Sequence, residues 1–187
     1  MPSKRVTILL IVAILLGGGA IVFAATSAED HSRQDVVAER AAHVMPFSLG
    51  ATTHIFDANA RGGTERVLAK DPSDKGEITL IREHLRHEAH AFSRGDFTDP
   101  AAIHGAGMPG LETMQAGYLD IAFRYRELTG GAELAYATDE PNLIAAVHAW
   151  FDAQLRDHAG DAATADHNDT NQSSHPAPAD HDAHHSG

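Results

Sequence analysis

An uncharged run of 20 residues near the N-terminus most constrains how this chain can be organised. The run extends from Val6 to Ala25 and consists mainly of Ile, Leu, Val, Ala and Gly. An apolar segment of this length can span a bilayer as a helix. Lys4 and Arg5 precede the run, and positive charge at this place keeps the N-terminus cytoplasmic and exports the remainder of the chain. We therefore expect residues 1–28 to deliver the rest of the protein across the inner membrane.

Two interpretations of this segment remain open. The length of the run favours an uncleaved membrane anchor, whereas the small residues after it, such as Ala25 and Ala28, favour cleavage as a signal peptide. Both interpretations place the folded part on the periplasmic side of a bacterial cell envelope. The protein is then either anchored in the inner membrane through residues 6–25 or secreted.

The rest of the chain divides into three parts by composition. Residues 29–42 are charged and rich in alanine, which predicts a stalk or a short helix. Residues 43–158 carry alternating and helical apolar patterns over a length sufficient for one domain with its own core. Residues 159–187 contain no Lys, Arg, aromatic residue, Val, Ile, Leu or Met. Because this tail cannot bury enough apolar surface to fold, we expect it to be disordered.

Alternation of apolar residues predicts two hairpins in the domain. The first pairs residues 52–57 with residues 64–69 around a glycine-containing turn at 60–63. The second pairs residues 121–125 with residues 134–136 around another glycine-containing turn. These hairpins supply four mainly antiparallel strands.

A helical spacing of apolar residues follows each hairpin. It predicts helices at about 73–94 and 140–157, each entered through a proline-containing start signal. The stretch at 96–116 is predicted to be a long loop, a feature that is usually functional or mobile in compact domains. We therefore expect an α+β domain with a four-stranded, mainly antiparallel sheet and both helices on one of its faces.

Charge and cysteine content exclude several functional classes. A formal net charge of −12 argues against nucleic-acid binding through phosphates. The chain has no cysteine, so it forms no disulfide, thiolate nucleophile or zinc–cysteine site. It also lacks GxSxG, HExxH and P-loop motifs, and any GxGxxG in a strand–helix context. An enzyme is therefore the less expected class.

Histidine is the anomalous residue, with 14 copies against 14 Lys and Arg combined. Neutral imidazole is a good ligand for Cu²⁺, Zn²⁺ and Ni²⁺, and histidine-rich tracts commonly bind these ions. The tail contributes five histidines among several aspartates. They are His167, His175, His181, His184 and His185. The alternative is an acidic solubilising tail whose histidines bind nothing.

A metal site inside the folded domain is also predicted. His84 and Glu88 share a helix face, and two neighbourhoods combine histidine with methionine, a pair that suits copper and especially Cu(I). The predicted ligands are His54, His84 and His104, with Met45, Met108 and Glu88 as further candidates. The alternative is that Met45 and Met108 are apolar side chains that fill space in the core and bind no metal.

The histidines of the two predicted helices also have interpretations that involve no metal binding. His84 can equally be a boundary residue hydrogen-bonded to Glu88 or to a backbone carbonyl. His87 is expected on the surface. His148, at the edge of the second helix stripe, is expected to pair with Asp152 one turn later.

Three segments between His43 and His158 carry a resemblance. HVMPFSLGATTHIF, GDFTDPAAIHGAGMPGL and HAWFDAQLRDH resemble a family of short bacterial proteins that often carry an aspartate carbamoyltransferase label. That enzyme's catalytic chain has an STRT phosphate loop and an HPxQ segment, and its regulatory chain has four zinc-binding cysteines. None of these occurs in this sequence. The resemblance therefore indicates how far the domain extends, and it does not imply aspartate carbamoyltransferase activity.

The leading hypothesis is an exported or membrane-anchored accessory protein that handles copper, zinc or nickel. One alternative is a non-enzymatic envelope module that holds a protein partner. Another is a small enzyme that uses histidines as acid–base groups. A cavity that gathers His54, His84 and His104 near a carboxylate such as Glu88 would favour chemistry over a purely structural role.

Overall fold

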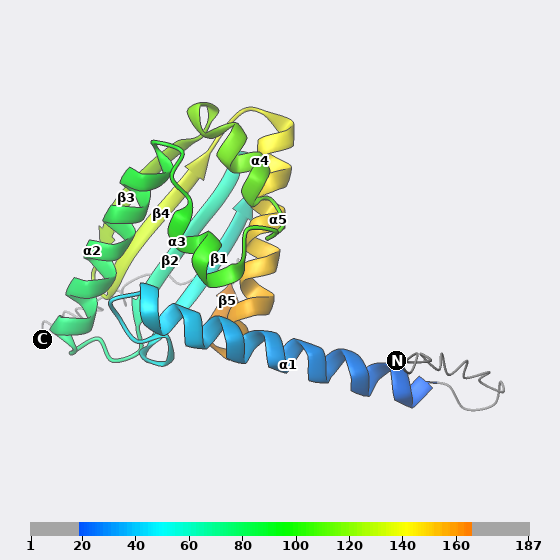
Figure 1. Ribbon diagram of the computed structural model, residues 1–187. Helices are drawn as coiled ribbons and strands as arrows, with labels where there is room; N and C mark the ends of the chain where they lie inside the picture. Colours follow the sequence, from blue (N-terminus) through cyan, green and yellow to red (C-terminus); the bar gives the residue numbers. More distant parts are fainter. Residues whose placement is uncertain (1–18, 166–187) are drawn as a thin grey trace, which may run out of the picture.

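The computed structural model describes residues 19–165, with side chains from residue 31 onward (Figure 1). Most of the predicted membrane-insertion run at 6–25 and the tail histidines, among them His181, His184 and His185, lie outside the described residues. Within residues 19–165, no helix is long and apolar enough to cross a membrane.

One mixed sheet forms the centre of the fold, in the order β3-β4-β2-β1-β5. Its strands are β1 (Thr52–Asn59), β2 (Gly62–Ala69), β3 (Ala122–Leu128), β4 (Gly131–Ala137) and β5 (Ala162–Thr164). The two predicted hairpins are β1–β2 and β3–β4, which are antiparallel, and β2 joins them by pairing antiparallel with β4. The α+β class is confirmed.

The predicted count of four strands is wrong, because β5 adds a fifth strand parallel to β1. β5 lies in residues that composition assigned to the tail. A three-residue edge strand needs only backbone hydrogen bonds to a free strand edge, so Ala162–Thr164 required no apolar alternation to pair. The sequence therefore carried no signal for it.

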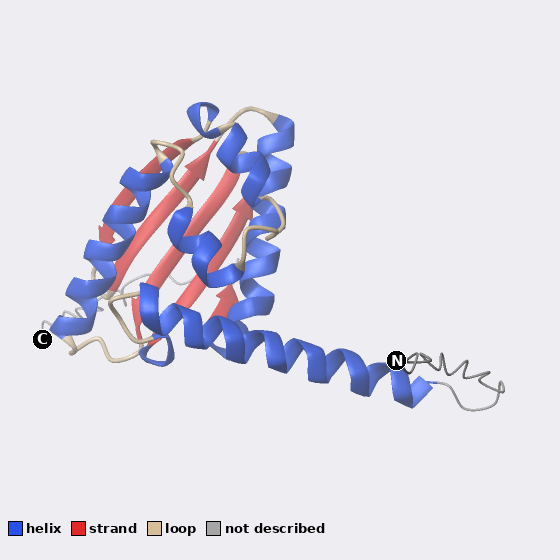
Figure 2. Ribbon diagram, in the orientation of Figure 1, coloured by secondary structure: helices blue, strands red, loops and turns tan. Residues whose placement is uncertain are grey.

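Two long helices cover one face of the sheet, α2 (Lys75–Phe92) and α5 (Pro141–His158) (Figure 2). Asp74 caps α2 by accepting a hydrogen bond from the Glu77 N–H at 3.0 Å, and Pro141 starts α5. The Tyr136 ring of β4 contacts Phe92 of α2 and Phe151 of α5. Both helices therefore pack on the strand face that carries Tyr136.

The helix α1 (Gly19–Val44) includes residues 29–42, for which composition predicted a stalk or a short helix. Its C-terminal part packs on the domain, because Val37 and Ala41 are buried in a small cluster with Ile103. The Gln34 side chain also donates a 3.1 Å hydrogen bond to the Arg156 carbonyl of α5. The rest of α1 extends away from the sheet (Figure 1).

The predicted long loop at 96–116 is wrong, because the segment folds into α3 (Thr98–His104) and α4 (Leu111–Ala116). Asp96 begins α3 by accepting hydrogen bonds from the Thr98 N–H at 3.1 Å and hydroxyl at 2.6 Å. Helices of 7 and 6 residues are too short to show an apolar period in the sequence. They lie between α2 and α5 over the sheet (Figure 1).

Gly110 fixes α4 against α5, and its replacement by alanine is expected to destabilise the protein by about 2–4 kcal/mol. Gly110 has φ +82°, and an added Cβ would lie 2.1 Å from the backbone oxygen of Ala146. Gly107 is the matched control, because nothing lies within 4 Å of a Cβ added there. Gly107→Ala should change stability by less than about 0.5 kcal/mol in urea unfolding. Equal stability of the two variants would contradict this packing.

Candidate functional site

A cavity of about 50 Å³ lies between the covered face of the sheet and helices α2, α3 and α5. This space holds a few water molecules or a single ion. Its polar lining comes from strands and helices far apart in sequence. These residues are His54, Glu65, His84, Glu88, Asp99, His104, Tyr136, Gln154 and His158.

The three histidines predicted as ligands, His54, His84 and His104, all line this cavity. They come from β1, α2 and α3. Their ligand atoms do not form a compact set: among the described residues, the group whose ligand atoms all lie within 4.8 Å of one another is His87, Glu88 and Asp99. The predicted trio thus shares a cavity, and its nitrogens are not in coordination geometry.

His104 is held by a buried carboxylate. Its Nδ1 lies 2.8 Å from Oδ2 of Asp157, and that carboxylate also receives two hydrogen bonds from the Arg33 guanidinium of α1. Burial alone would raise the pKa of Asp157, but the hydrogen bonds from His104 and Arg33 lower it below its usual value. Asp157 is therefore ionised and accepts a hydrogen bond from the His104 Nδ1–H, so Nε2 is the ring nitrogen through which His104 can bind a ligand.

His54 and His158 contribute buried ring nitrogens without partners in the described part of the chain. The two rings stack with centroids 4.7 Å apart, and the His158 ring lies edge-on to His104 at 5.1 Å. His158 Nε2 lies 3.0 Å from Gln154 Oε1, whereas its Nδ1 has no partner. Neither nitrogen of His54 is hydrogen-bonded; its Nδ1 lies 3.5 Å from Glu65 Oε1, within ion-pair distance.

Burial keeps two of the cavity histidines neutral. It lowers the pKa of His158 well below the usual value, and proximity to His54 and His104 lowers it further. Burial likewise lowers the pKa of His84, whose ring contacts the Phe47 ring edge-on at 5.4 Å. His84 makes no hydrogen bond to Glu88 in the described structure, so it is not the hydrogen-bonded boundary residue of the alternative interpretation.

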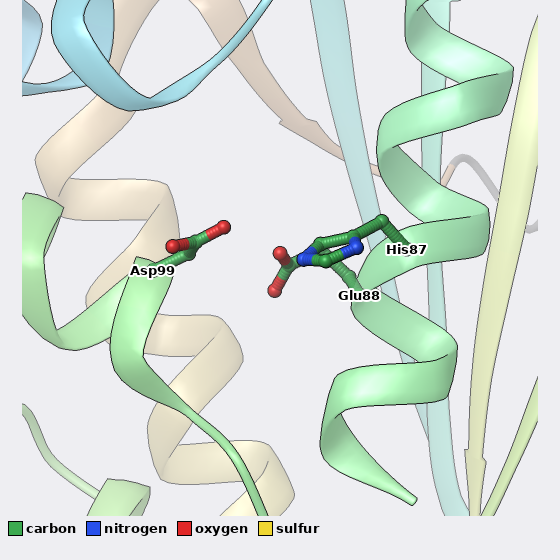
Figure 3. Close-up of side chains that lie close together, drawn as sticks. All are labelled: His87, Glu88 and Asp99. Carbon is green, nitrogen blue, oxygen red and sulfur yellow. The ribbon is translucent and has the colours of Figure 1, made fainter.

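The cavity is also lined by the carboxyl groups of Glu65, Glu88 and Asp99. Glu65 Oε2 accepts a 3.0 Å hydrogen bond from the Tyr136 hydroxyl. Burial raises the pKa of Glu88 to about 9, helped by the Asp99 carboxylate, the hydrogen bond to Asp99 and the charge of Glu65. Glu88 therefore keeps its proton at neutral pH. In Figure 3 the Glu88 and Asp99 carboxyl groups face each other across the space between α2 and α3.

The two predicted methionine ligands separate. Met45 is half-buried and lines the cavity beside Phe47. Met108 is 4% exposed and belongs to the apolar core, and it lines a different hollow near Arg33 and Arg40. Met108 therefore does not line this cavity, and its role as a metal ligand stays a prediction. His104 also lines that second hollow, so the two residues remain neighbours there.

Two other histidine predictions can be compared with the structure. His87 is exposed, as predicted. His148 does not pair with Asp152; its Nε2 donates to the carbonyls of Asn59 at 2.9 Å and Gly62 at 3.0 Å. The prediction for His148 is wrong because the β1–β2 turn, brought close by tertiary packing, offers backbone acceptors.

Several polar residues of the site were not predicted from the sequence. Asp157 and His158 end the stripe of α5, and His158 shares a face with Gln154 one turn earlier, which is the spacing that could have revealed it. Glu65 lies opposite Phe56 across the β1–β2 pair and faces inward with it. Asp99 and Arg33 had no comparable signal, since their positions depend on how α3 and α1 pack.

The arrangement combines neutral nitrogen donors with negative charge. Among the described residues, no Lys or Arg side chain lines the cavity. Such an environment suits a cation that accepts lone pairs from imidazole and carboxylate. Comparison with protein-family models, curated proteins and solved structures found no match for this chain.

Proposed function

We propose that the cavity binds one transition-metal ion, and that the protein is an exported or membrane-anchored accessory protein that handles copper, zinc or nickel in the cell envelope. The observation that carries the proposal is the set of buried imidazole nitrogens without partners around one small cavity. Among the described residues this set consists of both nitrogens of His54 and Nδ1 of His158, none of which has a hydrogen-bond partner. A buried polar atom without a partner costs about 1–3 kcal/mol, so a ligand that satisfies several of them gains affinity.

The Asp157–His104 pair supports a metal more specifically. Histidine ligands of metals usually donate their second ring N–H to a carboxylate, which fixes the tautomer and makes the free nitrogen a better donor. His104 has this arrangement, at 2.8 Å from Asp157. His158 lies edge-on to it, an orientation in which two rings can direct nitrogens to one ion. The ligand nitrogens of His54, His104 and His158 do not all lie within 4.8 Å of one another, so binding of one ion by all three requires side-chain rotations, including that of His54 out of its stack on His158.

The donor set bears on the identity of the metal. Imidazole nitrogens with carboxylate oxygens suit Zn²⁺, Cu²⁺ and Ni²⁺, whereas thioethers select Cu(I). Of the two methionines considered, Met45 alone lines the cavity. The site therefore favours a divalent ion over Cu(I).

The size of the cavity separates this proposal from a small acid–base enzyme. The enzyme alternative gains support from Glu88, whose pKa of about 9 makes it a proton donor at neutral pH. Substrate pockets usually measure about 300–1,000 Å³. A cavity of about 50 Å³ accommodates an ion far better than a substrate.

The direct test is a metal titration that separates the cavity from the tail. In the full chain, the five tail histidines would be replaced by alanine, and the metal-free protein would be titrated with Zn²⁺ and Cu²⁺ against a competing chelator. We expect at least one site with Kd tighter than about 1 µM, equivalent to roughly 8 kcal/mol. Weaker binding of every ion tested would refute the proposal.

Asp157→Asn is expected to weaken metal binding by about 10- to 100-fold without removing a ligand. The substitution keeps the side-chain shape but removes the charge that holds the His104 tautomer and accepts from Arg33. Asp152→Asn, an exposed change on the same helix, is the control. Competition titration measures the metal affinity of both variants. If both variants lose affinity equally, or if neither loses affinity, Asp157 does not orient a ligand.

A further inference from the structure

We propose that His87, Glu88 and Asp99 form a second cation site at the outer end of the cavity, suited to a divalent ion of the zinc class. This site goes beyond the cavity site, because none of its three residues belongs to the inner set of His54, His104 and His158. It stands on its own residues, whether or not the cavity binds metal.

The three side chains already lie close together. One ligand atom from each lies within 4.8 Å of the other two. Figure 3 shows His87 and Glu88 projecting from α2 toward Asp99 on α3. Zinc bonds of about 2.0–2.2 Å to histidine nitrogen and carboxylate oxygen need only small side-chain rotations from this arrangement. Three protein ligands leave a coordination position for water.

Glu88 also carries an unpartnered polar atom. Its side chain is 7% exposed, and its Oε1 is buried without a hydrogen-bond partner among the described residues. A surface cluster of acids would have water at every oxygen, whereas this oxygen lacks a partner inside the protein. An ion held by His87 and Asp99 would supply one and would displace the proton that Glu88 carries in the metal-free protein.

The three residues of the outer site differ in exposure, from solvent at one end to the cavity at the other. His87 is exposed and Asp99 is half-buried, while Glu88 lies inside. Glu88 and Asp99 line the cavity as well, and His87 does not. An ion at this position would therefore sit between solvent and the inner histidines, where it can exchange with either.

The test measures Zn²⁺ stoichiometry in the full chain with the five tail histidines replaced by alanine. Native mass spectrometry and chelator competition would compare His87→Ala with His90→Ala, a matched change of an exposed histidine on the same helix. We expect His87→Ala to lose one zinc equivalent, or at least about 100-fold in its affinity, and His90→Ala to lose neither. Asp99→Asn provides an independent variant and should reproduce the His87→Ala loss.

Identical zinc binding by the His87→Ala, Asp99→Asn and His90→Ala chains would overturn the outer site. This outcome is distinct from failure of the cavity proposal, which would show as no loss of zinc in a His104→Ala chain. Loss of one equivalent in His87→Ala supports the outer site in either case.

Discussion

Replacing Glu88 by glutamine is expected to raise the free energy of unfolding of the metal-free protein by about 5 kcal/mol at pH 8. The pKa of Glu88 is about 9 in the folded protein, whereas its usual value is 4.5. Between these values the unfolded chain loses the proton and the folded chain keeps it. Stability therefore falls as pH rises from about 4.5 to 9, at up to about 1.4 kcal/mol per pH unit. Glutamine removes this penalty because it never ionises.

The same substitution should change stability by less than about 1 kcal/mol at pH 5, because this pH lies only slightly above the usual pKa of 4.5 and little of the penalty has accumulated there. Glu83→Gln is the control, since Glu83 is exposed on the same helix. Urea unfolding at both pH values, in the presence of a chelator, measures the differences. If the stability gain of Glu88→Gln did not grow between pH 5 and pH 8, Glu88 would not be the buried neutral acid described above.

Removing two imidazoles should have the largest effect on metal binding. A chain with His104→Ala and His158→Ala is expected to bind Zn²⁺ in the cavity at least about 1,000-fold more weakly, a loss of roughly 4 kcal/mol. His104 offers an oriented Nε2, and His158 offers a buried Nδ1 without a partner in the described structure. Competition titration in the chain without tail histidines measures the loss.

Two comparisons keep this result interpretable. A chain with His43→Ala and His90→Ala loses two exposed histidines and should bind as the parent does. A chain with His158→Gln alone keeps a buried polar side chain, so it should fold and still bind more weakly. Unchanged affinity in the folded His104/His158 chain would remove these residues from the proposed ligand set.

The hairpins and long helices were predictable because their apolar periods extend over many residues. Ile81 and Leu85 of α2 and Phe151 of α5 are buried as the helical spacing predicted. The elements α3, α4 and β5 were not predictable because each is too short to show a period. Their formation depends on surfaces that the larger elements provide.

In the candidate site, too, some residue positions could be predicted from the sequence and others could not. His54 and His84 flank apolar positions of β1 and α2, so their place beside the core could be inferred from local pattern. His104 was grouped with Met108 because the two are close in sequence; both line the hollow near Arg33 and Arg40, but of the two only His104 also lines the cavity. Asp157 could not be connected to His104, since the two are 53 positions apart in sequence and only the tertiary fold, in which α1 packs on both α3 and α5, brings them together.

Anomalous diffraction from crystals of the full chain grown with Zn²⁺, with data collected above and below the zinc absorption edge, would show whether the cavity holds a metal. We predict an edge-dependent peak inside the cavity, within about 2.0–2.2 Å of nitrogens from His104 and at least one of His54 and His158. A cavity without such a peak, in crystals whose zinc lies elsewhere on the chain, would contradict a metal site there.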